Sequence, residues 1–318
     1  MSLLSVHNLT KTFSGANGAR VQAVSDVSFS VQAGEVLGVV GESGCGKTTL
    51  GHAILRLTEP DSGKVMYGGL DLVSATKSEL KRSRRDLQII FQDPFGSLNP
   101  RHKIGTVVGE PLLVHGIGSR SERRDRVASL LNLVGLPEDS SNRFPHEFSG
   151  GQRQRIAIAR ALALEPKLIV ADESVSALDV SIQSQILNLI AELRMKLGMS
   201  IIFISHDLSV IRHISDRIAV MYLGQIVEIG PAIQVMSKPQ HPYTQALLSS
   251  VPEISLSRNK ARATISGEPP DPSNPPPGCP FSNRCPQATS LCRMTRPKLL
   301  PVSGDAKGVE TACHLYAN

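Results

Sequence analysis

The sequence contains no tryptophan, and aromatic residues make up only 4% of its 318 residues. Proteins that bind single-stranded nucleic acid stack bases on aromatic side chains, so this scarcity argues against such a platform. No apolar run approaches the ~20 residues that cross a membrane. The first residues, MSLLSVHNLTKTF, lack the charged-then-apolar pattern of a secretory signal. We therefore expect a cytoplasmic protein that reaches membranes only through partners.

A strong excess of either charge is also missing. Lysine and arginine number 34 against 28 acidic residues, which leaves a net charge of +6. This charge is too small over such a length to predict a nucleic-acid partner. The 41% hydrophobic and 19% charged residues are typical of globular proteins and exclude collagen-like, coiled-coil and disordered chains. At ~150 residues per domain, the length suggests about two domains.

Cysteine is scarce except near the C-terminus. Cys45 stands alone, whereas four cysteines follow the proline-rich stretch 269–278: Cys279, Cys285, Cys292 and Cys313. Clustered thiols in a reducing compartment suggest metal binding before disulfides. Their spacing, C-x₅-C-x₆-C-x₂₀-C, lacks the short pairs of many zinc sites. An iron–sulfur cluster, Zn²⁺ and unligated thiols all stay open on this evidence.

Short apolar segments alternate with helical patterns through residue 235. Four runs are nearly continuous in apolar residues, as buried parallel strands are: 35–40, 87–91, 168–172 and 200–205. Before the last run, one apolar stripe has helical spacing: Ile182, Ile186, Leu189, Ile190, Leu193 and Leu197. The alternation predicts an α/β fold with a mainly parallel sheet. We interpret residues 93–164 as a helical insertion packed beside this core.

A glycine-rich motif, G-x-x-x-x-G-K-[ST], follows the first of these strands. Its glycines let backbone amides surround phosphate oxygens, Lys47 can reach the β- and γ-phosphates, and Thr48 can ligate Mg²⁺. A helix should follow, with Leu50, Ile54 and Leu57 on one face. The motif predicts an ATP site at Gly41, Ser43, Gly44, Cys45, Gly46, Lys47, Thr48 and Thr49. The alternative is a glycine-rich turn that binds nothing.

The strand 168–172 ends beside two acidic residues. Asp172 can hold Mg²⁺ directly or through water, and Glu173 can orient and deprotonate an attacking water. By themselves these residues could be solvated acids at a strand end. Together with the glycine-rich motif upstream, they predict nucleotide hydrolysis.

Further motifs carry a resemblance to a known family. Phe148-Ser149-Gly150-Gly151-Gln152, which precedes a helical run, resembles the signature motif of ATP-binding-cassette (ABC) ATPases. Other motifs of that family occur in order: Phe13 at the adenine-stacking position, Gln92 in the Q-loop, Ser176 to Asp179 as the D-loop, and His206 as the switch histidine. The chain is identified as a member of this family over residues 3–235.

The resemblance implies an architecture. Residues 1–235 would form a P-loop nucleotide-binding domain of α/β class, with a mainly parallel core sheet, an antiparallel β subdomain and a helical subdomain at about 93–164. Residues 236–318 would form an extension with a proline-rich linker and a small four-cysteine segment.

The resemblance also implies a mechanism. Mg²⁺ would be held by Thr48, Gln92 and Asp172, with Glu173 as the base and His206 at the γ-phosphate. The ATP of a partner cassette would contact the signature residues Ser149, Gly150, Gly151 and Gln152. Phe13 could instead belong to the core. Phe148 and Ser174 depart from the leucine and proline usual at these positions, but neither change removes a catalytic group, so we expect an active ATPase.

Two segments narrow the resemblance. The turn-rich Gln92 to Arg101 segment and HPYTQALL (241–248) resemble ATPase subunits of dipeptide, oligopeptide and nickel importers, and EPLLVHG (110–116) resembles the second of their two ATPase subunits. This implies a heterodimer with a second ABC ATPase, two transmembrane permease subunits, a periplasmic or extracellular solute-binding protein, and a peripheral location on the cytoplasmic face of the inner membrane. No nucleic-acid partner is expected.

The resemblance further suggests that the four cysteines hold a [4Fe–4S] cluster, with Zn²⁺ as the alternative. His314, beside Cys313, is either a bystander or a substitute ligand. Two other classes of function remain. One is a non-transport cassette ATPase acting on nucleic acid or ribosomes, and the other is a regulator whose cysteine segment senses iron or redox state. The cargo is not specified: peptide is the default, and nickel or another small solute stays open.

Overall fold

The computed structural model describes residues 2–15, 19–176, 178–250, 267–268, 270–302 and 308–316. Its contacts define two units. The first contains Gln32–Glu35 and Ala75–Ile204, and the second contains Ser2–Val31, Val36–Ser74 and Ser205–Asn318. Three parts of the sequence predictions lie outside the described residues: Ala177 of the D-loop, Pro269 of the proline-rich stretch, and residues 251–254, the end of a helix that the sequence predicts over 240–254.

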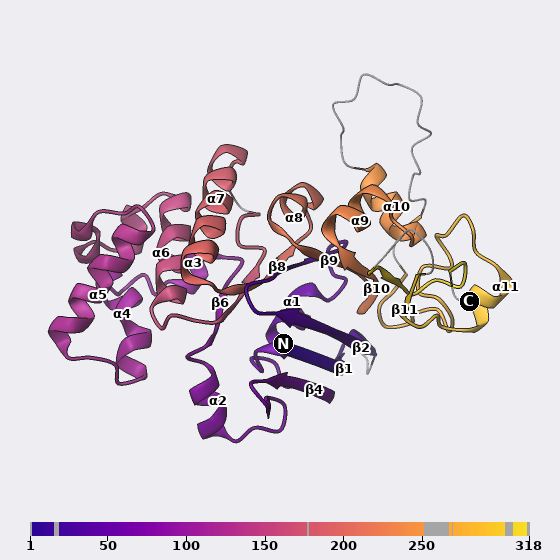
Figure 1. The fold of residues 1–318 in the computed structure, drawn as a ribbon, viewed down its shortest axis with the longest axis horizontal. Helices are drawn as coiled ribbons and strands as arrows, with labels where there is room; N and C mark the ends of the chain where they lie inside the picture. The colour runs from indigo at the N-terminus through magenta and orange to yellow at the C-terminus, as the bar shows by residue number, and fades with distance from the viewer. Residues whose placement is uncertain are drawn as a thin grey trace. The chain divides into compact units, whose positions relative to one another are not determined.

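The first unit contains three parallel strands (Figure 1). They are β6 (Leu87–Ile90), β7 (Leu168–Asp172) and β8 (Ser200–Ser205). Leu168 is paired with Leu87 on one side and Ser200 on the other. Every residue of β7 and β8 is buried, which explains their continuous apolar sequences. The predicted strands are confirmed.

Helices fill the stretch 93–164, as predicted, and flank it on both sides. In chain order they are α2 (Lys77–Ser83), α3 (Pro94–Ser97), α4 (Ile104–Val114), α5 (Arg120–Leu133), the 3₁₀ turns η2 (Glu138–Asn142) and η3 (Pro145–Glu147), α6 (Gly150–Leu162) and α7 (Val180–Leu197). Ser119 begins α5 with a capping box, in which its hydroxyl accepts the Glu122 amide. The helices α4, α5 and α6 pack on one another.

The apolar stripe of α7 is confirmed in its middle, whereas Ile182 near its start is half-buried and its last residue is exposed. Ile186, Leu189, Ile190 and Leu193 are buried, but Leu197 is 44% exposed. Leu197 is the last residue of the helix, and Gly198, at φ +65°, turns the chain away immediately after it. The helical period places Leu197 on the same stripe, but at the helix end its side chain stays partly exposed.

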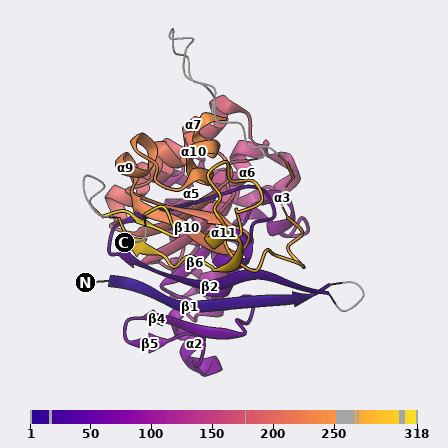
Figure 2. The ribbon, with the colours of Figure 1, turned by 90° about the vertical axis from the view of Figure 1, so that its right-hand side faces the viewer.

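The N-terminal part of the second unit is an antiparallel sheet (Figure 2). Its strands are β1 (Ser2–Ser14), β2 (Arg20–Gln32), β4 (Ser62–Tyr67) and β5 (Leu70–Asp71), in the order β2-β1-β4-β5. Alternating burial along β1 places Leu4, Val6 and Leu9 in the core. This sheet is the antiparallel β subdomain that the family resemblance implies.

The rest of the second unit combines one parallel strand pair with antiparallel strands. Its strands are β3 (Val36–Val40), β9 (Arg217–Tyr222), β10 (Gln225–Pro231), β11 (Leu300–Pro301) and β12 (Glu310–Thr311). Its helices are α1 (Lys47–Ile54), α8 (Leu208–Ile214), α9 (Ala232–Ser237), α10 (Pro242–Ser249) and α11 (Ser290–Met294). β3 is parallel to β9, and β12 is antiparallel to β10, so residues near the C-terminus join this sheet.

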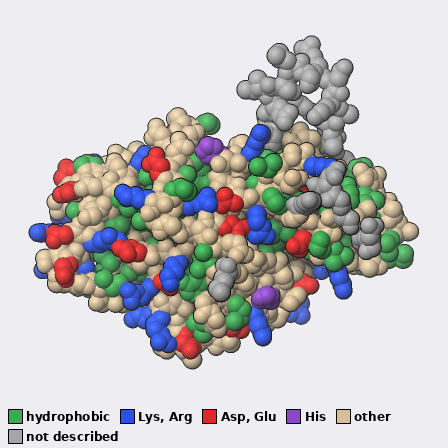
Figure 3. Space-filling model, in the orientation of Figure 1, with side chains coloured by type: hydrophobic (Ala, Val, Ile, Leu, Met, Phe, Trp, Pro, Cys, Tyr) green, Lys and Arg blue, Asp and Glu red, His purple; other side chains and the backbone are tan. Residues whose placement is uncertain are grey.

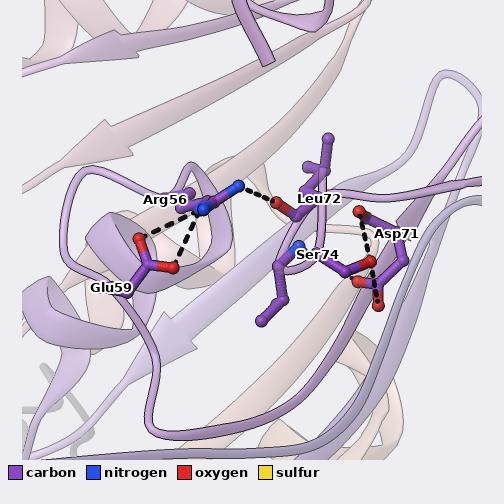
Figure 4. A network of polar contacts seen from close by, with 6 residues as sticks. Arg56, Glu59, Asp71, Leu72 and Ser74 are labelled. Atoms are coloured by element: carbon purple, nitrogen blue, oxygen red, sulfur yellow. Dashed lines mark hydrogen bonds and ion pairs between the residues drawn. The ribbon is translucent and has the colours of Figure 1, made fainter. Parts of the chain in front are cut away.

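The helix after the glycine-rich motif is shorter than predicted. Leu50 and Ile54 are buried in α1, but Leu57 lies beyond it and is 46% exposed. Arg56, at φ +49°, ends the helix by turning the chain. Its Nε donates to the Glu59 carboxylate at 3.0 Å and its Nη1 donates to the Leu72 carbonyl at 3.1 Å (Figure 4). These bonds hold the turn at Arg56, which ends α1 before Leu57.

The surface matches the modest net charge. On the face drawn in Figure 3, basic and acidic side chains are interspersed and form no single basic field. Within the described part of the chain, no helix combines the length and apolar character needed to cross a bilayer.

Candidate active site

The glycine-rich loop joins β3 to α1 in the second unit. Gly46 begins the helix in a left-handed conformation, at φ +104°, which favours glycine. A Cβ atom on Gly46 would overlap the Ala23 carbonyl, and one on Gly41 would overlap the carbonyl of Met221. The loop therefore follows a path that requires glycine at both ends, which is how a backbone comes close enough to bind phosphate.

Lys47 lies inside this loop. Its side chain is buried, and its Nζ donates to the carbonyls of Gly41 at 2.9 Å and Glu42 at 3.0 Å. The ammonium is thus held at the centre of the loop, where a polyphosphate would meet it. Cys45 lies 3.9 Å from the ammonium, and burial raises the pKa of its thiol, so it is a loop side chain that stays protonated.

Two side chains from the C-terminal part of the chain support Glu42 of the loop. The Glu42 amide donates to the Tyr243 hydroxyl at 2.9 Å. The Glu42 carboxylate accepts two hydrogen bonds from Arg284, with Nη1–Oε2 and Nη2–Oε1 distances of 2.9 and 3.1 Å. The sequence predictions missed both supporting residues. The HPY tripeptide that contains Tyr243 indicates a family resemblance, but it does not predict a contact between Tyr243 and the loop.

The HPY segment is held in place by a buried acid. Glu228 of β10 accepts the amides of Gln240 at 2.7 Å and His241 at 2.9 Å. The Nδ1 of His241 accepts the Tyr243 amide at 3.0 Å, which caps α10. Burial lowers the pKa of His241 to about 3, so its ring is neutral at neutral pH and can act as an acceptor. These contacts fix Tyr243 at the start of α10.

The first unit brings together the predicted Q-loop and acidic residues. Asp172 is the last residue of β7 and is 2% exposed. Glu173 follows at φ +42°, an uncommon conformation for a residue other than glycine. The Gln92 side-chain amide donates to Glu173 Oε2 at 2.9 Å. The side chains of Gln92 and Glu173, which come from two separate motifs, are therefore in direct contact.

The segment after Gln92 is attached to α6. The Arg153 guanidinium lies over the Phe95 ring, 3.8 Å from its centroid, and Arg160 donates to the carbonyl of Ser97. Phe95 itself is 61% exposed. The Q-loop segment and the signature helix are thus held together, while one apolar ring remains at the surface.

The signature residues form the start of α6. Ser149 is its N-cap: its hydroxyl accepts the Gln152 amide at 3.4 Å, and the Gln152 side chain accepts the Ser149 amide at 3.0 Å. Gly151 lies against Ile182 of α7, where a Cβ atom would come within 2.5 Å of Ile182 Cγ2. Both Ser149 and Gln152 therefore have a structural task in addition to their predicted contact with nucleotide.

Three further residues singled out from the sequence, Phe13, His206 and Asp179, lie at the surface. Phe13 is 43% exposed, with Lys11 Nζ 5.4 Å from its ring centroid, so the alternative that it belongs to the core is wrong. His206 follows β8 and is exposed. Asp179, the N-cap of α7, is also exposed and makes no side-chain cap hydrogen bond.

The four C-terminal cysteines line a single small pocket in the second unit. Cys279, Cys292 and Cys313 are buried, and Cys285 is half-buried. Burial, together with the three neighbouring thiols, raises the pKa of Cys279 to about 11. Among the described residues, no three His, Cys, Asp or Glu side chains are arranged around a point that could hold a metal ion. The thiols therefore surround one space without converging on one centre.

Comparison with known proteins decides the family. Residues 24–176 match the model of the ABC transporter family, and residues 227–292 match the oligopeptide/dipeptide transporter C-terminal region. A putative peptide import ATP-binding protein of Brucella ovis is 50% identical over 300 residues, covering 94% of both chains. The chain belongs to the ABC transporter ATPase family.

Other relatives of this ABC ATPase agree. The di/tripeptide transport ATP-binding protein DppF of Pseudomonas aeruginosa is 48% identical and covers 94% of both chains. A solved dimeric, post-hydrolysis structure of the ATP-binding cassette MJ0796 with ADP and phosphate is 31% identical, with a TM-score of 0.66 over 72% of this chain and 98% of that one. The predicted ABC cassette fold is thereby confirmed, and the match to the C-terminal family covers Tyr243, Arg284 and three of the cysteines.

Proposed function

We propose that this ABC ATPase is the ATP-hydrolysing subunit of a peptide importer. The observation that carries the proposal is the matched C-terminal region, residues 227–292, which accompanies the cassette and is named for oligopeptide and dipeptide transporters. The relatives named for peptide import match over nearly the whole chain, which supports the same conclusion. Nickel or another small solute is the alternative cargo.

We further propose that the chain binds and hydrolyses MgATP through these motifs, which occur along the sequence in the order typical of the family. Lys47 and the loop amides bind the phosphates, and Mg²⁺ is held by Thr48, Gln92 and Asp172. Glu173 positions and deprotonates the attacking water, since its carboxylate is already oriented by Gln92. His206 donates to the γ-phosphate, and Phe13, with its exposed ring, stacks on adenine.

The signature residues serve a second cassette. Helix N-termini attract phosphate, and α6 begins at Gly150, next to Ser149. We propose that Ser149, Gly150, Gly151 and Gln152 contact ATP held by the partner subunit, with Asp179 at the same interface. The dimeric state of the cassette MJ0796 supports this arrangement. The partner is proposed to be a second, different ABC ATPase.

The exposed ring of Phe95 in the segment after Gln92 suits contact with a permease. We propose that two permease subunits dock at this segment, which places the chain on the cytoplasmic face of the inner membrane as a peripheral subunit. A solute-binding protein would deliver cargo to the permease from the other side. Residues 1–235 are proposed as the cassette and 236–318 as the C-terminal extension.

We propose that Cys279, Cys285, Cys292 and Cys313 hold a [4Fe–4S] cluster. The chemistry of four thiols around one pocket fits such a group, because a cluster is bound at four separate irons. Zn²⁺, which is bound by four sulfur ligands in many structural sites, is the alternative occupant of this pocket. A bound cluster would link the four cysteines and so order a proline-rich segment that has only a small hydrophobic core.

The importer proposal is tested by tagging the chain, solubilising membranes gently and identifying what co-purifies. Two permease subunits and a second cassette ATPase are expected. Uptake of labelled dipeptides and of nickel, in cells with and without the gene, then identifies the cargo. Recovery of only ribosomes, nucleic acid or soluble proteins would overturn transport while leaving ATP hydrolysis intact.

A further inference from the structure

The cysteine segment contacts the glycine-rich loop directly, and both belong to the second unit. Arg284, next to Cys285, reaches Glu42 in a two-point ion pair. Its Nη1 also donates to the Tyr222 hydroxyl at 3.3 Å. The Arg284 side chain is only 7% exposed and that of Glu42 is 25% exposed. Because water competes poorly at such a site, this pair holds its geometry better than a surface salt bridge does.

An aromatic cluster holds Arg284 in position. Phe281, which lines the cysteine pocket, meets Tyr222 edge-on at 5.4 Å between ring centroids and Tyr243 at 5.5 Å. The Arg284 amide donates to the Phe281 carbonyl at 3.0 Å, so both residues belong to one turn. The same turn thus packs against the tyrosine that binds the Glu42 amide and carries the arginine that binds the Glu42 carboxylate.

Both anchors act on one residue of the loop. Glu42 lies between Gly41 and Ser43, within the backbone that would surround the phosphates. Fixing its amide and its carboxylate restricts the loop on either side. A loop held in its binding conformation loses less entropy when it binds a ligand, so nucleotide affinity should depend on these anchors.

We propose that Arg284 is a positioning residue for nucleotide binding: through Glu42, the C-terminal cysteine segment sets the conformation of the phosphate-binding loop. Arg284 itself does not contact nucleotide. The inference rests on the proposed ATP site, but it does not depend on the cargo or on the identity of any metal. It assigns the C-terminal segment a role in nucleotide affinity.

The test is calorimetric titration of the full chain with MgADP. Arg284→Gln and Glu42→Gln should each raise Kd at least about ten-fold, because either change frees the loop. The double variant should be no worse than either single one, since both remove the same link. Arg284→Lys should recover only part of the affinity, because an ammonium cannot reproduce the two-point geometry.

Arg56→Gln is the matched control, because Arg56 also pairs with a glutamate in the second unit, Glu59, and donates to the Leu72 carbonyl, and both partners lie outside the glycine-rich loop. Its Kd should stay within about two-fold of wild type. In steady-state ATP hydrolysis, Arg284→Gln should raise KM much more than it lowers kcat. Glu42→Gln keeps the test decisive if Arg284→Gln fails to fold, because Glu42 is the more exposed partner.

Unchanged Kd values in Arg284→Gln and Glu42→Gln would overturn the inference, as would additive effects or equal weakening by Arg56→Gln. A wild-type chain that binds no nucleotide would overturn the proposed ATP site and this inference together. Failure to recover permeases would overturn only the importer assignment, so the two kinds of failure are distinguishable.

Discussion

The side chain of Gln92 donates a 2.9 Å hydrogen bond to Glu173, a residue 81 positions away in the sequence. Glu173 follows directly after the buried Asp172 and has a left-handed backbone, at φ +42°. Such a conformation costs energy and is often found where a side chain must be aimed. The bond orients the carboxylate and connects it to the Q-loop segment.

Changing Glu173 to Gln should separate binding from hydrolysis. The variant keeps the shape of the side chain but cannot accept a proton, so ATP turnover should fall by about 10²–10⁴-fold. MgATP binding should persist. Steady-state phosphate release and nucleotide titration measure the two effects. Glu165→Gln is the control, because Glu165 also has a positive φ in the first unit and should retain the wild-type rate. A wild-type rate in Glu173→Gln would remove Glu173 from the mechanism.

Gly151 and Gly150 should respond differently to alanine. A Cβ on Gly151 would come within 2.5 Å of Ile182 Cγ2, whereas one on Gly150 would lie 3.6 Å from Leu178 in ordinary contact. Gly151→Ala should lower the free energy of unfolding by about 1–3 kcal/mol, the usual cost of overpacking. Gly150→Ala should cost less. Denaturant unfolding compares the two variants, and adding Ile182→Ala should restore part of the loss in Gly151→Ala. Equal stability of the two alanine variants would contradict this packing.

His241 should make the protein less stable in acid. Its folded-state pKa is about 3 against an ordinary 6.5, because it is buried as a neutral ring. Between these values the unfolded chain binds more protons than the folded one. The stabilisation is complete above pH 6.5 and is lost as the pH falls toward 3, at up to about 1.4 kcal/mol per pH unit.

The variant His241→Asn isolates this effect, because asparagine can still accept the hydrogen bond that begins α10. Burial raises the pKa of Glu228, but Glu228 is present in both proteins, so its contribution to the pH dependence cancels when the variant is compared with the wild type. Denaturant unfolding between pH 5 and 7.5 should show a shallower pH dependence in the variant. Identical slopes would mean that His241 is not held neutral in the folded protein.

The cysteine pocket should bind iron and sulfide. Anaerobic purification followed by iron and acid-labile sulfide assays should find about four of each per chain, as a [4Fe–4S] cluster requires. Cys292→Ser should lose most of both. Cys45→Ser is the matched control, since Cys45 is buried in the glycine-rich loop and does not line the pocket. Zinc alone, or no metal, would rule out the cluster.

Local patterns predicted much of this protein. Continuous apolar runs predicted β7 and β8 because each strand of a buried parallel sheet is covered on both faces. The glycine-rich motif predicted the loop before α1, since its backbone conformation at Gly46 depends on the residue itself. The predictions that Leu57 and Leu197 continue the apolar faces of their helices were wrong, because a helical period does not show where the helix ends.

The sequence by itself determined the motifs and most of the elements, because turn chemistry and hydrophobic period act between neighbouring residues. Only the tertiary structure decided that Arg284 would reach Glu42, 242 positions away. That contact depends on the packing of Phe281 against Tyr222 and Tyr243. No local pattern specifies such a contact, because three distant segments must be buried together before the arginine and the glutamate can meet.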